Sequence, residues 1–104
     1  MADQAVIERD VIQALRGCYD PEIPVDIYEL GLVYGIRVGP DGAVDIRMTL
    51  TAPSCPAAQE LPAQVERAVR ALPGVTGARV EITFDPPWDR DRMSDAAKLK
   101  LGLL

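Results

Sequence analysis

Two short runs of alternating apolar and polar residues, joined by a tight turn, limit the fold of this 104-residue chain more than any other feature. The first run covers residues 32–38 and the second covers residues 44–50, and each has apolar side chains at every second position. Residues 39–42, Gly-Pro-Asp-Gly, separate them with the composition of a reverse turn. Because an alternating strand has one apolar face, this pattern predicts a β-hairpin with one side buried.

Helical periodicity appears on both sides of the hairpin. Residues 3–17 carry apolar side chains at three- and four-residue steps, and Asp3 is the expected N-cap. Residues 56–72 repeat this spacing, and Pro56 suits the first helical position because its missing N–H would be unpaired there. Pro62 predicts a kink or a loose first turn, since it removes one hydrogen bond inside the helix.

The rest of the chain completes an α-β-β-α-β-α order. Residues 78–84, from Ala78 to Phe84, form a third alternating run, and Ser94 is the expected cap of a short helix from residue 95 to about residue 101. Helices must cover the apolar face of the strands, which predicts an α+β fold: a two-layer α/β sandwich with two helices on one face of a small mixed sheet. Residues 1–104 are expected to make a single domain.

Composition removes several classes of function. The net charge is −5, with 16 acidic against 11 basic residues, which disfavours binding to a nucleic-acid backbone. The sequence contains no histidine, so Cys–His pairs, Ser–His–Asp triads and imidazole metal sites are excluded, and we do not expect an enzyme. No apolar run reaches the roughly 20 residues of a membrane span, and the expected location is the cytoplasm.

The topology predicts that three irregular segments meet at one edge of the sheet. A right-handed crossover makes the third strand parallel to the second, while the hairpin makes the first strand antiparallel to it. The start of strand one and the ends of strands two and three therefore share an edge. Residues 18–31, 51–56 and 85–93 are brought together there.

Cys55 is the most reactive group expected at this edge. It lies where the second strand ends and the helix predicted over 56–72 begins, so backbone N–H groups and the helix dipole favour its thiolate. Without a histidine base, a thiolate here is better suited to a soft metal than to nucleophilic catalysis. The residues that would shape the supporting loop are Thr49, Thr51, Pro53, Ser54 and Pro56.

One thiolate is too few to hold an iron–sulfur cluster, which generally has four protein ligands. Two protomers of a homodimer, a partner protein or nearby carboxylates would complete the shell. Trp88, after two prolines, either covers the sheet edge or contacts a partner protein, and Cys18 closes the apolar stripe of the first helix as a core residue. The carboxylates expected at the edge are those of Asp20, Glu22, Asp26 and Glu29.

Five ordered blocks resemble the SufT/PaaD-like family of iron–sulfur cluster assembly proteins, also called metal–sulfur cluster biosynthetic proteins. The Thr-x-x-x-Cys-Pro segment is the most specific of them, and together they cover nearly the whole chain. The blocks are Asp20-Pro21-Glu22-Ile23-Pro24-Val25, Leu30-Gly31-Leu32-Val33-Tyr34, Met48 to Pro56, Leu72-Pro73-Gly74-Val75 and Asp85-Pro86-Pro87-Trp88.

The resemblance implies a maturation factor that works beside a scaffold of the SUF system and assists transfer of iron or a cluster to client apo-proteins. The family cysteine corresponds to Cys55, and the family's acidic positions to Asp20, Glu22 and Glu29. Asp26, like Trp88, is expected to contact a partner protein. Iron or the cluster would be bound transiently, with no permanent cofactor. The alternative is an adaptor that links a scaffold to its clients and binds no metal. An RNA-binding role rests on topology alone and would need a basic groove.

Overall fold

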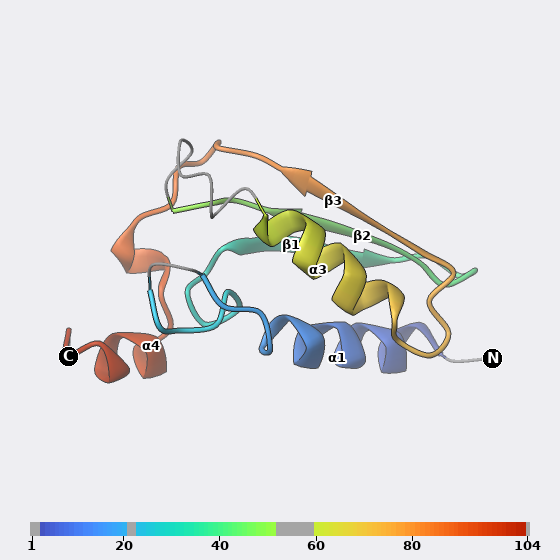
Figure 1. The fold of residues 1–104 in the computed structure, drawn as a ribbon, viewed down its shortest axis with the longest axis horizontal. Helices are drawn as coiled ribbons and strands as arrows, with labels where there is room; N and C mark the ends of the chain where they lie inside the picture. The colour runs from blue at the N-terminus through green and yellow to red at the C-terminus, as the bar shows by residue number, and fades with distance from the viewer. Residues whose placement is uncertain (1–2, 21–22, 52–59, 104) are drawn as a thin grey trace.

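The computed structural model describes residues 3–20, 23–51 and 60–103, and within these ranges it has the element order expected from the sequence. A single turn of 3-10 helix, η1, is the one addition to that order in the described residues (Figure 1). The elements are α1 (Gln4–Leu15), β1 (Val33–Val38), β2 (Ala43–Met48), α3 (Leu61–Arg70), β3 (Gly77–Ile82), η1 (Arg90–Arg92) and α4 (Asp95–Lys100).

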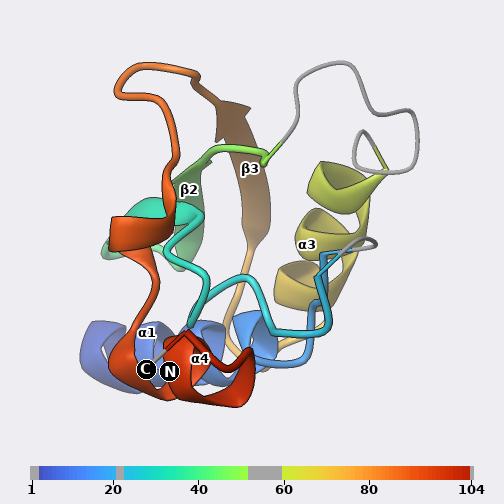
Figure 2. The same ribbon diagram turned by 90° about the vertical axis from the view of Figure 1, so that its left-hand side faces the viewer.

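The three strands form one mixed sheet in the order β1-β2-β3. β1 and β2 are antiparallel and β2 and β3 are parallel, as predicted. α1 contacts β1, α3 contacts β3, and the two helices contact each other, so both cover the same face of the sheet (Figures 1 and 2). The predicted two-layer α+β architecture is therefore confirmed.

The core lies between the two helices and the sheet, and it is aliphatic. Each of the two helices contributes one stripe of buried residues, and β2 contributes every second side chain. Because the chain has only five aromatic residues in its 104, packing of Val, Ile and Leu supplies most of the apolar burial that stabilises the fold. The largest fully buried side chains are those of Ile7, Val11, Leu15, Ile27, Leu30, Leu32, Val44, Ile46, Met48, Leu61, Val65 and Val69.

Two helix caps agree with the sequence. The Asp3 carboxylate accepts a hydrogen bond from the N–H of Ala5 at 3.3 Å, and the Ser94 hydroxyl accepts one from the N–H of Ala97 at 3.1 Å. Each bond pairs an N–H group that the helix itself leaves without a partner. Ala97 is buried, so this bond also holds α4 against the core.

The second long helix begins later than predicted. Its described N-cap is Glu60 and its first residue is Leu61, whereas the periodicity indicated a start at residue 56. Pro62 explains this start, because in the first turn its missing N–H and fixed φ are tolerated, which they would not be in a helix interior. The expected first position, Pro56, lies outside the described residues.

Two strand assignments also differ. β3 ends at Ile82, and Phe84, expected on the apolar face, is 47% exposed. In β1, the register shifts between Val33 and Gly35, so Val33 packs against the core in place of Tyr34. An extra residue of this kind is a β-bulge, which reverses the inward and outward order of neighbouring side chains.

No helix among the described residues is both long enough and apolar enough to span a lipid bilayer.

Candidate functional site

Hydrogen bonds join the irregular segments at one edge of the sheet, as the topology predicts. The N–H of Thr49 donates to the carbonyl of Leu32 at 2.8 Å, which links the end of β2 to the chain before β1. The N–H of Ser94 donates to the carbonyl of Glu29 at 2.9 Å, which links the C-terminal segment to the same loop. Figure 2 shows these segments gathered beyond the strand ends. The described parts of segments 18–31 and 85–93 therefore meet there.

Asp20 is the most deeply buried carboxylate of the described residues, with 4% of its surface exposed. Its Oδ2 accepts a hydrogen bond from the Thr51 hydroxyl at 3.2 Å, and its Oδ1 accepts one from the N–H of Ile23 at 3.3 Å. Hydrogen bonds to a buried carboxylate offset part of the cost of removing its charge from water. Asp20 therefore ties the loop after α1 to Thr51, the last described residue before the segment that contains Cys55.

Thr49 is fully buried, and its hydroxyl has no hydrogen-bond partner among the described residues. A buried hydroxyl without a partner costs about 1 to 3 kcal/mol, so its presence at this edge is not explained by stability. The prediction that Thr49 and Thr51 support the cysteine loop remains a prediction, although Thr51 does bond Asp20.

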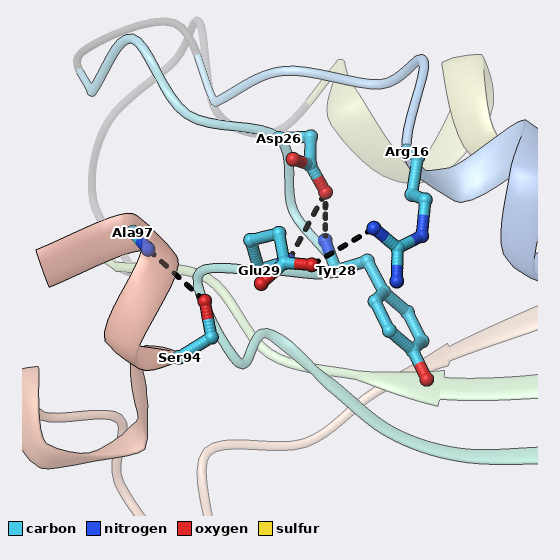
Figure 3. Close-up of polar contacts among 6 residues, drawn as sticks. All are labelled: Arg16, Asp26, Tyr28, Glu29, Ser94 and Ala97. Atoms are coloured by element: carbon cyan, nitrogen blue, oxygen red, sulfur yellow. Dashed lines mark hydrogen bonds and ion pairs between the residues drawn. The ribbon is translucent and has the colours of Figure 1, made fainter. Parts of the chain in front are cut away.

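Asp26 and Glu29 are engaged in contacts within the protein (Figure 3). The Asp26 Oδ2 accepts hydrogen bonds from the N–H groups of Tyr28 at 3.1 Å and Glu29 at 3.0 Å. The Glu29 carboxylate forms an ion pair with Arg16 at 2.9 Å, and the Arg16 guanidinium also lies 4.9 Å from the centre of the Tyr28 ring. Both carboxylates thus hold the loop in shape, and binding of a metal ion by the Glu29 carboxylate would compete with its ion pair to Arg16.

Trp88 lies partly buried against the core. Its indole N–H donates to the carbonyl of Leu30 at 2.7 Å, a short bond that fastens the segment after β3 over the loop before β1. This contact is the edge-covering role that the sequence suggested. A contact between Trp88 and a partner protein remains a prediction.

Cys18 is a free thiol with 2% of its surface exposed, and it belongs to the core as predicted. Its Sγ donates to the carbonyl of Ala14 at 3.5 Å. Burial raises the pKa of the Cys18 thiol, because the apolar surroundings disfavour the charged thiolate. Cys18 is therefore poorly suited to bind a metal or to react.

Five of the predicted site residues lie outside the described part of the chain, so their arrangement stays a prediction. Within residues 3–20, 23–51 and 60–103, no group of three or more Cys, Asp or Glu side chains is placed to hold a metal ion. Of the expected donors Asp20, Asp26 and Glu29, only Asp20 bonds a residue next to the cysteine segment. The five residues are Glu22, Pro53, Ser54, Cys55 and Pro56.

Sequence reasoning missed a second feature of this edge, formed around Tyr34. The Tyr34 hydroxyl donates to the carbonyl of Pro86 at 2.8 Å, and the guanidinium of Arg92 lies 4.9 Å from the centre of the Tyr34 ring. The sequence signal was weak. Regular alternation places Tyr34 on the apolar face of its strand, and Arg92 belongs to a run of alternating charges that is typical of a solvated surface.

Comparison with known proteins agrees with the fold and with the motifs. A family model described as iron–sulfur cluster assembly protein matches residues 8–82, which is most of the chain. The chain belongs to this family. An Fe–S protein maturation auxiliary factor of Porphyromonas gingivalis is 50% identical over 97 residues, which cover 93% of this chain and 92% of that protein.

Two other relatives support membership of the iron–sulfur cluster assembly family. The Fe–S protein maturation auxiliary factor SufT of Staphylococcus aureus is 39% identical, over 81% of this chain and 96% of that protein. A crystal structure of a domain of unknown function, DUF59, from Bacillus anthracis superposes with a TM-score of 0.88 and 34% identity, covering 97% of this chain and 96% of that one. The resemblance to SufT-like proteins seen in the sequence blocks is thereby confirmed.

Proposed function

We propose that the protein is an iron–sulfur maturation factor that receives iron or a cluster as cargo, holds it briefly through Cys55 and releases it to client apo-proteins. Family membership and the maturation role named for a relative 50% identical to this chain support this general function. The role is that of a carrier in the cytoplasm and not of an enzyme, in keeping with the absence of histidine from the chain.

The hydrogen bond between Asp20 and Thr51 is the observation that supports a role for this edge of the sheet. It fixes one end of the segment that contains Cys55 at an edge lined by the 18–31 loop. A single thiolate leaves a metal shell incomplete, and an incomplete shell exchanges ligands readily. A client thiolate would bond to the iron as the bond from Cys55 breaks, with no change in oxidation state. Asp20, Glu22 and Glu29 would supply oxygen ligands, or a second protomer would supply a second Cys55.

Anaerobic incubation with ferrous iron and sulfide tests this function, with visible absorption and bound iron as the readouts. We expect the wild type to retain iron and Cys55→Ser to lose most of it. The matched control is Cys18→Ala, which removes the buried thiol and should retain iron as well as the wild type does. Circular dichroism on each variant verifies that it is folded.

The alternative is an adaptor that links a scaffold to its clients without binding metal. The engagement of Glu29 with Arg16 favours it, because this ion pair competes with metal binding by the Glu29 carboxylate. No iron retention by either protein would support the adaptor, and equal retention by the wild type and Cys55→Ser would refute Cys55 as the residue that holds the iron.

A further inference from the structure

A hollow of about 540 Å³ lies at the edge of the sheet where β1 begins and the segment after β3 passes over it. We call it the arginine hollow because two arginines contribute to its lining. Its volume is within the range of about 300 to 1,000 Å³ that is usual for binding sites of small molecules and short peptide segments. The lining residues used below are Gly31, Tyr34, Arg47, Asp85, Pro86 and Arg92.

One wall of the arginine hollow is held in place by contacts that fix Arg92. The bulge in β1 places Tyr34 in the lining, together with Arg47 of β2. The Tyr34 hydroxyl bonds the carbonyl of Pro86, and the Arg92 guanidinium lies over the Tyr34 ring at 4.9 Å. The backbone of Arg92 also packs against Gly31, where a side chain would not fit. Stacking of this kind orients a guanidinium and leaves its N–H groups at the ring edge available for hydrogen bonds.

Neither arginine has a strong acidic partner in the described part of the chain. Arg47 has one ion pair there, with Glu81 at 3.9 Å, and both side chains are more than half exposed, so this contact contributes little. Arg92 has no ion pair with any described residue, and its guanidinium stacks on the Tyr34 ring. On a chain with a net charge of −5, a hollow lined by two guanidinium groups and one carboxylate, that of Asp85, is a local site of net positive charge.

We propose that the arginine hollow binds an acidic segment of a partner protein, in an extended conformation and with one Asp or Glu carboxylate between Arg47 and Arg92. A planar guanidinium binds a carboxylate through two parallel hydrogen bonds. Asp85, also in the lining, would accept an N–H group of the bound peptide backbone. This combination suits a peptide better than a free anion or a nucleic acid, because the Asp85 carboxylate repels a ligand that has negative charge alone.

The proposal deepens the proposed function by naming the chemistry of its partner. The hollow includes residues from β2 and the segment after β3, at the edge where β2 leads toward Thr51. A client or scaffold held there by an acidic segment would lie near the chain that leads to Cys55. The identity of the partner as a client or scaffold rests on the proposed function, while binding of the acidic peptide does not.

The test is an NMR titration of the full-length, 15N-labelled protein with the peptide acetyl-Gly-Glu-Asp-Gly-amide. We expect saturable shifts of the Arg47 and Arg92 side-chain N–H signals and of the Tyr34 backbone N–H signal. The uncharged peptide acetyl-Gly-Gln-Asn-Gly-amide, in which side-chain amides replace the carboxylates, and inorganic phosphate serve as controls. Both should bind at least about tenfold more weakly than the acidic peptide does. No iron is present, so the result does not depend on the metal-carrying role.

Variants locate the binding in the arginine hollow. Arg92→Gln and Arg47→Gln should each weaken the acidic peptide by roughly tenfold, because a charge-assisted pair is lost. Arg37→Gln is the matched control: Arg37 is exposed on β1 of the same sheet but does not line the hollow, and its change should leave the affinity within about twofold. Unchanged backbone spectra away from the substitution verify folding.

Four results would overturn the proposal. They are the absence of saturable shifts, binding of the uncharged peptide as tight as that of the acidic peptide, phosphate binding as tight as that of the acidic peptide, and a loss of affinity in Arg37→Gln equal to that in Arg47→Gln and Arg92→Gln. Iron retention by the wild type alongside any of these would leave the proposed function standing and remove only the acidic-peptide site. Binding of the acidic peptide without iron retention by the wild type would refute the metal-carrying role and leave the acidic-peptide site standing.

Discussion

Gly31→Ala is expected to destabilise the protein more than its small size suggests. Gly31 has a φ of +78°, a region that residues with a Cβ rarely adopt. A Cβ at this position would overlap the carbonyl oxygen of Arg92 and lie 2.8 Å from its carbonyl carbon. Both atoms belong to the backbone of η1, so the strain cannot be relieved by rotation of a side chain.

The magnitude follows from the contacts that η1 would lose by moving away. The left-handed conformation costs an alanine about 1 to 2 kcal/mol. Displacement of η1 lengthens the bond between the N–H of Ser94 and the carbonyl of Glu29, now 2.9 Å, and the bond between the Trp88 indole and Leu30, now 2.7 Å. Each such bond contributes about 1 kcal/mol net, so the expected loss in free energy of unfolding is about 3 to 4 kcal/mol.

Urea denaturation followed by circular dichroism measures this loss, and Gly102→Ala is the matched control. Gly102 has a φ of +76°, and a Cβ there would meet nothing within 4 Å. Gly102→Ala therefore reports the conformational cost alone, about 1 to 2 kcal/mol or less near the end of the chain. If the two variants differ by less than about 0.5 kcal/mol, the close approach of Gly31 to Arg92 is not the cause and the reasoning is refuted.

Three further predictions concern the site edge. Burial raises the pKa of the Cys18 thiol, so as pH rises the unfolded chain loses the thiol proton before the folded chain does. The free energy of unfolding is therefore unaffected by this group below pH 9.0. Above pH 9.0 it falls, by up to about 1.4 kcal/mol per pH unit, until the folded pKa is reached. Urea titrations at several pH values should show this slope in the wild type and not in Cys18→Ala, and equal slopes would contradict it. Thr51→Val should lower the free energy of unfolding by about 1 to 2 kcal/mol through loss of the bond to Asp20, whereas Thr51→Ser should restore it; no difference between these variants would count against the bond. Trp88→Phe should cost at least about 1 kcal/mol in thermal unfolding, since it leaves the buried Leu30 carbonyl without its 2.7 Å partner, and an unchanged melting temperature would argue that water replaces it.

Local patterns were enough to predict the elements, the sheet topology and two caps. The hairpin around residues 39–42 and the caps at Asp3 and Ser94 depend on neighbours in the sequence, so their chemistry is visible without the fold. The meeting of the irregular segments at one edge followed from chain direction alone. These parts are independent of how individual side chains pack.

Sequence reasoning was wrong or incomplete where contacts between residues distant in the sequence decide the structure. Alternation cannot reveal the bulge between Val33 and Gly35, because a one-residue shift leaves the same pattern of apolar residues and reverses their faces. For Trp88 the sequence offered both edge covering and a partner contact, and its bond to Leu30, 58 residues away, could not be read from neighbouring residues. The sequence indicated acidic residues at one edge, but only the structure shows Asp20 buried against Thr51 and Glu29 paired with Arg16.

The sealed position of Cys18 has a practical consequence for experiments on this protein. The sequence has two cysteines, and the first is 2% exposed inside the folded core. In the folded chain, a maleimide dye or spin label directed at Cys55 would therefore meet no competing reaction at Cys18. Distance measurements from that label could follow the docking of clients without prior removal of any native residue.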